Sequence, residues 1–200
     1  MHTPITLTVD DTTITTTDAQ LAHHVLRSLR PIAVTQIVLP APAELPRLGA
    51  FWPGQGGVFA GTIRGRDGHP DYHLIVASGP EAEADDIAWG GYGKESGATS
   101  AWDGMANTSA LVDSEIDHPA AQWADALEHE GHADWYLPAQ AELTMAWANV
   151  PELFSKGWHW SSSQFSASYA WLQLFNDGDQ TSSAKGNELR ARAVRRLIIQ

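Results

Sequence analysis

The chain has 200 residues, of which 43% are hydrophobic and 18% charged, a composition typical of a globular rather than a disordered protein. Its formal net charge of −12 argues against general nucleic-acid binding, which depends on neutralising phosphates. The absence of cysteine excludes disulfides, thiolate nucleophiles and cysteine-ligated metals. The sequence lacks both a membrane-spanning apolar stretch, about 20 residues long, and a recognisable signal peptide. We therefore expect a cytoplasmic or virion-associated protein with no membrane partner.

Residues 1–46 predict a small N-terminal α/β element. Alternating apolar and polar residues over 5–16, interrupted by two aspartates, predict a β-hairpin. A helix is expected over 19–29 and another strand over 32–39, before a proline-rich linker. This element serves either as decoration or as an oligomerisation or docking element, which would make the chain a homo-oligomer. The pattern alone does not separate these alternatives.

Residues 47–200 predict one larger domain that starts with a sheet. Two β-rich runs, 58–64 and 72–77, flank a Gly/Pro-rich turn and predict a second hairpin. The Gly/Ser-rich segment 80–117 predicts loops with one short turn or strand.

Two helices are expected next. The first runs from His118 or Pro119 to Glu130, because Pro119 suits the first helical position and apolar residues recur every three to four positions. The second begins near Pro138 and ends before Pro151.

The C-terminal forty residues predict three antiparallel strands, at 158–160, 170–175 and 191–197, joined by exposed loops. Four of the twelve basic residues, Arg190, Arg192, Arg195 and Arg196, lie in or directly before the last run, and we interpret them as a solvated face that blocks edge pairing. The nine tryptophans suit core pillars in a fold rich in loops. Together these features predict an α+β domain, with an antiparallel sheet and two helices.

Four motifs in this order and spacing resemble the Lcl C-terminal domain family. They are Trp52-Pro-Gly-Gln-Gly-Gly, Asp134-Trp-Tyr-Leu-Pro-Ala-Gln-Ala-Glu-Leu, Trp160-Ser-Ser-Ser-Gln and Arg192-Ala-Val-Arg-Arg. The resemblance covers roughly residues 50–197. It implies a C-type-lectin-like fold of the formylglycine-generating-enzyme type. The cysteines that make formylglycine in such enzymes are absent here, so that activity is not implied.

The tail also resembles the variable proteins of diversity-generating retroelements, in which the last sheet displays diversified positions that bind other molecules. The residue types at the corresponding positions here can all be written by changing only the adenines of an AAC codon. The resemblance implies ligand-binding positions at Phe165, Tyr169, Leu172, Leu174, Asn176, Asp177, Asp179, Thr181, Ser182, Ser183, Ala184 and Gly186.

These positions divide into apolar anchors and polar contacts, as in antibody loops. Phe165, Tyr169, Leu172 and Leu174 would be the anchors, and the polar residues would add adaptable hydrogen bonds. The scaffold between them is expected to consist of Trp160, Trp171, Phe175 and Val194.

The sequence gives little evidence for a metal site or a catalytic site. His129 and His132 are spaced i, i+3, not the i, i+4 of a helical zinc site, and we interpret them as a solvated helix end. Asp177 and Asp179 offer oxygen ligands, but the rest of a calcium loop is missing. We predict no catalytic residue, no metal site and no cofactor.

The predicted function is non-enzymatic binding of a protein or glycan ligand by the C-terminal strands and loops. One alternative is a phage or bacterial structural or assembly protein that uses the lectin-like fold as a scaffold. The other, weaker alternative is a metal-dependent hydrolase.

Overall fold

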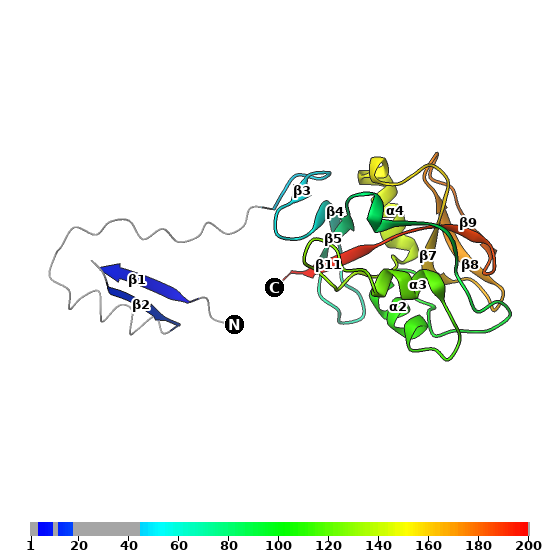
Figure 1. Ribbon diagram of the computed structural model, residues 1–200, viewed down its shortest axis with the longest axis horizontal. Coiled ribbons are helices and arrows are strands. Elements are labelled where there is room, and N and C mark those ends of the chain that lie inside the picture. The colour runs from blue at the N-terminus through cyan, green and yellow to red at the C-terminus, as the bar shows by residue number, and fades with distance from the viewer. Residues whose placement is uncertain (1–3, 10–11, 18–44, 200) are drawn as a thin grey trace. The chain divides into compact units, whose positions relative to one another are not determined.

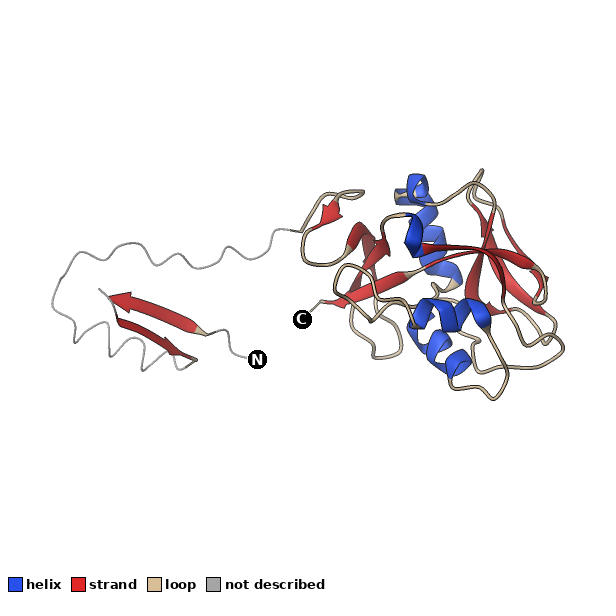
Figure 2. Cartoon of the chain, viewed as in Figure 1, coloured by secondary structure: helices blue, strands red, loops and turns tan. Residues whose placement is uncertain are grey.

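A computed structural model describes residues 4–9, 12–17 and 45–199 (Figures 1 and 2). The chain forms two compact units, Met1–Leu45 and Pro46–Gln200. In the first unit, β1 (Ile5–Val9) pairs antiparallel with β2 (Thr12–Thr16), as the threonine-rich alternation predicted. The helix and strand predicted over 19–29 and 32–39 lie outside the described residues.

The second unit contains a four-stranded antiparallel sheet in the order β11-β5-β4-β3. Its strands are β3 (Phe51–Trp52), β4 (Gly57–Ile63), β5 (Tyr72–Ala77) and β11 (Val194–Ile198). The predicted hairpin is confirmed, since β4 and β5 pair across the Gly/Pro-rich turn with a bulge between Phe59 and Gly61.

A five-stranded sheet, in the order β6-β10-β7-β8-β9, carries the C-terminal segment. Its strands are β6 (Glu83–Ala88), β7 (Trp158–Gln164), β8 (Tyr169–Leu174), β9 (Gln180–Ala184) and β10 (Glu188–Arg192). The neighbours are antiparallel except β10 and β7, which meet in parallel where Arg190 faces His159. The expectation that 180–184 forms a loop is wrong: this polar segment is the edge strand beside β8.

The last apolar run is also not one strand. Ala193 separates β10 from β11, and the two strands belong to different sheets. Backbone bonds hold the crossing point, since Ala77 N donates to Ala193 O (3.1 Å) and Ala193 N donates to Ala82 O (3.2 Å). The C-terminal run therefore joins the two sheets.

We expected the arginines of this run to form a solvated face, and this expectation is wrong. Arg192 and Arg195 are only 5% and 7% exposed. Each of the four arginines pairs with a carboxylate far away in the sequence, a contact that local pattern does not reveal. The pairs are Arg190–Asp85, Arg192–Glu83, Arg195–Asp134 and Arg196–Asp103.

The described residues contain three α-helices: α2 (Gly104–Val112), α3 (Pro119–Asp125) and α4 (Gln140–Asn149). Short 3-10 turns, η1 (Pro80–Ala82) and η2 (Pro151–Leu153), follow β5 and α4. The two predicted helices are α3 and α4. Figure 1 shows α2 beside α3, with which it makes contact.

Helix α2 falls in the segment predicted as loops. Asp103 starts it, because its carboxylate accepts the Ala106 N–H (3.0 Å) as an N-cap. Helix α3 ends at Asp125 rather than Glu130, because 129–132 forms a tight turn in which His129 and His132 exchange two backbone bonds of 3.0 Å.

Four of the nine tryptophans are buried in the core, as predicted for core pillars, and the other five are half-buried. Trp89 and Trp160 are fully buried, and each indole N–H has a backbone acceptor: Trp89 donates to Ser161 O (2.8 Å) and Trp160 to Ile87 O (3.0 Å). These side chains lie in the apolar cluster between the five-stranded sheet and α2 and α3, and they connect β6 to β7.

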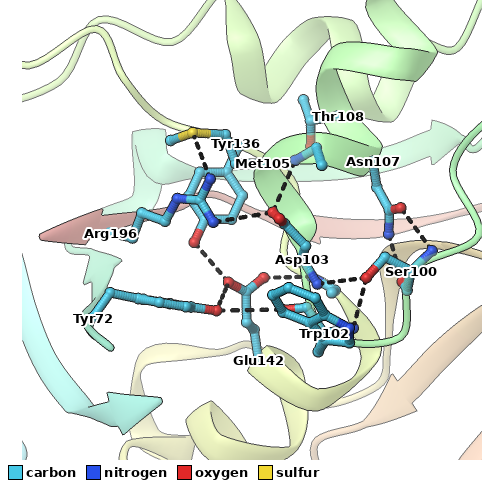
Figure 3. Close-up of polar contacts among 12 residues, drawn as sticks. Tyr72, Ser100, Trp102, Asp103, Met105, Asn107, Thr108, Tyr136, Glu142 and Arg196 are labelled. Carbon is cyan, nitrogen blue, oxygen red and sulfur yellow. Dashed lines mark hydrogen bonds and ion pairs between the residues drawn. The ribbon is translucent and has the colours of Figure 1, made fainter. Parts of the chain in front are cut away.

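A buried polar network joins the four-stranded sheet to α4 (Figure 3). The fully buried Glu142 accepts hydrogen bonds from the hydroxyls of Tyr72 (2.6 Å) and Tyr136 (2.7 Å) and from Ala139 N–H (2.7 Å). Burial raises the pKa of Glu142 to about 7, although these three donors and the nearby Arg196 act in the opposite direction. The network fixes the start of α4 against β5.

The unit is thus a mixed α+β structure with mostly antiparallel sheets, which agrees with the predicted class. Among the described residues, none of the helices has the length and apolar character needed to cross a bilayer.

Candidate ligand-binding surface

Eleven of the twelve predicted ligand-binding residues have accessible side chains or backbone. Seven are exposed, namely Phe165, Tyr169, Asn176, Asp177, Asp179, Thr181 and Gly186. Four are half-buried, namely Leu174, Ser182, Ser183 and Ala184.

Leu172 is the exception, and its assignment as a ligand anchor is wrong. It is 2% exposed and belongs to the main apolar cluster. In the β7–β8 register it lies opposite Trp160, on the face of the sheet that packs into the core. Strand alternation places Leu172 and Leu174 on the same face of the sheet. Leu172 is buried there, whereas Leu174, at the end of β8, is only half-buried.

The eleven accessible residues form a strip along edge strand β9 and the turns at its two ends rather than one compact patch. Alternation along β9 places Thr181 and Ser183 on one face of the sheet and Ser182 and Ala184 on the other. Tyr169 pairs with Ala184 at one end of the β8–β9 ladder, and Gln173 pairs with Gln180 at the other. Four residue steps at about 3.3 Å each separate these ends by roughly 13 Å. Edge strand β9 connects them, so the strip runs from the 165–169 turn along β9 to the turn before it.

An aromatic group occupies one end of the strip. Phe165 and Tyr169 are 55% and 44% exposed, and the ring of Phe165 contacts Trp171 edge-on at 5.1 Å between centroids. Backbone bonds from Phe165 N and Ser166 N to Tyr169 O, both 3.0 Å, close the turn that carries them. A short turn closed by backbone hydrogen bonds therefore presents two aromatic side chains to solvent.

Trp171 was expected to be a buried scaffold residue, and it is half-buried instead. It supports Phe165 from below and adds its own edge to the aromatic end. The other three predicted scaffold residues, Trp160, Phe175 and Val194, are buried as expected.

The opposite end of the strip is polar and acidic. Asn176, Asp177 and Asp179 are exposed around Gly178, whose φ of 93° only glycine adopts readily. A Cβ at this glycine would collide with the indole of Trp147 on α4, so the turn lies directly on that ring. No group of three or more metal-ligating side chains occurs among the described residues, these aspartates included.

The buried and half-buried residues between the accessible positions form a supporting frame for the strip. Gln180 donates to Thr144 Oγ1 (2.8 Å) and accepts from Gln140 Nε2 (2.9 Å), which attaches β9 to α4. Phe175 stacks on Phe154 with centroids 3.7 Å apart. The strip therefore lies on a packed support at its acidic end.

A buried ion pair lies under the same sheet. Glu83 of β6 accepts from Arg192 Nε of β10 (3.0 Å) and from His159 Nε2 of β7 (3.1 Å). Burial by itself would raise the pKa of Glu83, but hydrogen bonds from His159 and Ser155 and the charge of Arg192 outweigh it and lower the pKa to about 2. Glu83 therefore stays ionised and holds three strands together.

Lys185 supports the aromatic end from below. Its side chain is fully buried, with Nζ 4.5 Å from the centre of the Trp89 ring. Nζ donates to Gln164 Oε1 (2.7 Å) and to Lys94 O (2.8 Å). Burial lowers the pKa of Lys185 to about 8.

His129 and His132 are not at a helix end, which corrects the sequence interpretation. They lie in the tight turn after α3, where His129 is 6% exposed and its Nδ1 lies 3.4 Å from a carboxylate oxygen of Glu81. His132 Nε2 lies 3.1 Å from Gly54 O. The turn joins the η1 region and the loop before β4 to the body of the domain.

No protein-family model matches this chain, and no match is found among curated proteins. The resemblance to the Lcl C-terminal domain family and to retroelement variable proteins therefore remains a hypothesis. The strip itself presents exposed aromatic and polar side chains, which suit recognition by contact.

Proposed function

We propose that the chain is a non-enzymatic binding module with a C-type-lectin-like fold, and that the strip on β8, β9 and their turns contacts a protein ligand. One observation carries the proposal. In the C-terminal segment, accessible residues that could contact a ligand alternate with buried residues that support them. Eleven of the twelve positions are accessible, whereas Ala170, Gln173, Phe175 and Lys185 between them are buried, as is Trp160 shortly before them.

The chemistry of the strip favours a protein over a glycan as ligand. Phe165 and Tyr169 provide rigid apolar area at low entropic cost, and the serines of 166–168 and 181–183 provide adaptable hydrogen bonds. Protein-binding antibody loops use the same combination of residues. Binding of a glycan is the competing outcome in the test below.

We further propose that the eleven positions are diversified by a retroelement. The support is that the buried Leu172 is the only one of the twelve at which free variation would disturb the core. Sequencing the DNA that neighbours the gene tests this proposal. A near-copy of the codons for 158–197 with adenines at these positions, next to a reverse transcriptase gene, would support this proposal, and its absence would reject it.

The binding function itself can be tested with a display library. The eleven accessible positions are varied with adenine-mutated AAC codons on full-length chain, and the library is sorted against lysozyme as a defined protein probe. We expect binders that the starting chain does not contain. A matched library that varies eleven exposed positions elsewhere in the domain should yield none. Equal yields from the two libraries, or clones that recognise only the glycans of a control panel, would contradict the proposal.

A further inference from the structure

The loop after β6 presents one exposed tyrosine on a fixed turn. Tyr92 is 63% exposed, the highest value among the exposed large apolar and aromatic residues described. Gly90 and Gly91 precede it with φ of 87° and 63°. A Cβ on either glycine would collide with Asp117 or His118, so the backbone of the turn packs tightly on the start of α3.

Lys185 attaches this turn to the aromatic end of the strip. Gly90 N donates to Lys185 O (3.0 Å), and Lys185 Nζ donates to Lys94 O (2.8 Å), so both ends of the Tyr92 turn bind one residue. Lys185 N in turn donates to Ser168 O (3.0 Å), in the turn between Phe165 and Tyr169. Three chain segments that are distant in sequence therefore meet at Lys185.

Gln164 makes the second connection. Its Oε1 accepts from Lys185 Nζ (2.7 Å) and from Ser96 N (2.9 Å), and its Nε2 donates to Glu95 Oε2 (2.5 Å). Phe165 is the next residue along the chain. The segment 90–96 is therefore held beside the aromatic turn by side chains from both β7 and the end of β9.

We infer that Gly90–Glu95 is a third component of the ligand-binding surface, with Tyr92 as its aromatic contact and Lys185 as the residue that positions it beside Phe165 and Tyr169. This inference rests on the proposed function. It extends the surface to a segment that the C-terminal resemblance does not include.

The size of the combined surface favours a folded protein as the partner. An aromatic side chain buries about 150–250 Å². Tyr92, Phe165 and Tyr169, each about half exposed, thus offer roughly 300 Å² together. One side of a standard protein–protein interface covers about 800 Å², so these three residues would supply more than a third of it.

Hydrogen exchange tests the positioning role of Lys185 without any ligand. In K185M we expect the amides of Ser96 and Lys94 to exchange at least about tenfold faster, with the amides of β4 and β5 unchanged. K94M is the matched control, because Lys94 contributes only its backbone carbonyl to the contact. Equal exchange in the two variants would overturn the positioning role. Should K185M fail to fold, Q164M removes the side-chain acceptor of Lys185 Nζ, and it is judged by the Lys94 amide alone, because the Ser96 amide bonds to Gln164 itself.

Affinity measurements on the lysozyme-binding clones test Tyr92 directly. Across most clones we expect Y92A to weaken the lysozyme Kd at least about tenfold, and F51A, an exposed aromatic of β3, to leave it unchanged. If clones bind and Y92A has no effect, this inference fails while the proposed function stands. If no clone binds lysozyme, the proposed function fails and the inference fails with it.

Discussion

The buried frame of the five-stranded sheet and the accessible strip beside it come from the same forty residues but obey different physical demands. In the frame, side chains such as Trp160, His159 and Arg192 each have a specific partner, so both shape and charge are fixed. In the strip, side chains such as Phe165, Thr181 and Asp177 face solvent. We therefore expect tolerance to substitution to change from one residue to the next along a strand.

The largest expected effect comes from breaking the buried ion pair of the frame. Glu83→Ala leaves Arg192 buried without its carboxylate and should lower the free energy of unfolding by about 3–5 kcal/mol. Asp85→Ala is the control on the same strand. It breaks the exposed pair with Arg190 and should cost under about 1 kcal/mol. Urea denaturation measures both, and similar losses would remove the distinction between frame and surface.

Leu172 and Thr181 face each other across the β8–β9 ladder, so alanine variants of the two compare a frame residue with a strip residue at one position. Leu172→Ala should cost about 2–5 kcal/mol, because it leaves a cavity in the main apolar cluster. Thr181→Ala should change stability by less than about 0.5 kcal/mol, because Thr181 is exposed. If L172A lowered the free energy of unfolding only slightly, Leu172 would again be a candidate ligand contact.

The two buried carboxylates predict opposite pH dependences. The pKa of Glu142 is raised to about 7, so its stabilising contribution is complete below about pH 4.5 and is lost as the pH rises through 7. The pKa of Glu83 is lowered to about 2, so its contribution is present above about pH 4.5 and is lost as the pH falls toward 2.

Urea denaturation between pH 2 and pH 8 separates these contributions. The stability of wild type relative to E142Q should fall by on the order of 2–3 kcal/mol between pH 5 and pH 8. Relative to E83Q, wild type should instead lose stability between pH 4.5 and pH 2. Parallel curves for wild type and E142Q would show that Glu142 does not titrate in this range.

The smallest expected effect on stability belongs to the aromatic end of the strip. Phe165→Ala and Tyr169→Ala should each change the free energy of unfolding by less than about 0.5 kcal/mol, because both side chains are largely exposed. Thermal unfolding with Trp160→Ala as the buried control checks this. A loss above about 2 kcal/mol for either exposed residue would place it in the frame.

Local pattern predicted the elements whose signals are local. Two β-rich runs around a Gly/Pro-rich turn predicted the β4–β5 hairpin, alternation predicted β8, and prolines marked the limits of α4. Helix α2 was missed because its start depends on one capping carboxylate, Asp103, in a segment rich in loop-forming residues. Strand β9 was missed because its serines and threonine carry no apolar alternation.

The site depended more on contacts distant in sequence. Exposure was predicted for all twelve positions and eleven of them are accessible, but the division of the strip into an aromatic and an acidic end follows from the ladder register. The partners of Arg192 and Arg195 lie 109 and 61 residues away, so charge pattern gave no indication of burial. The Tyr92 turn had no sequence signal beyond its glycines, since only the fold brings it to Lys185.

We expect replaceable surface positions to alternate with buried frame positions that tolerate little substitution. Protease resistance of two displayed libraries measures this difference most directly, one varying the eleven accessible positions and the other varying Trp160, Ala170, Leu172, Gln173, Phe175 and Lys185. We predict that most clones of the first library resist protease as the starting chain does and that few clones of the second do. Equal resistance of the two libraries would contradict the account.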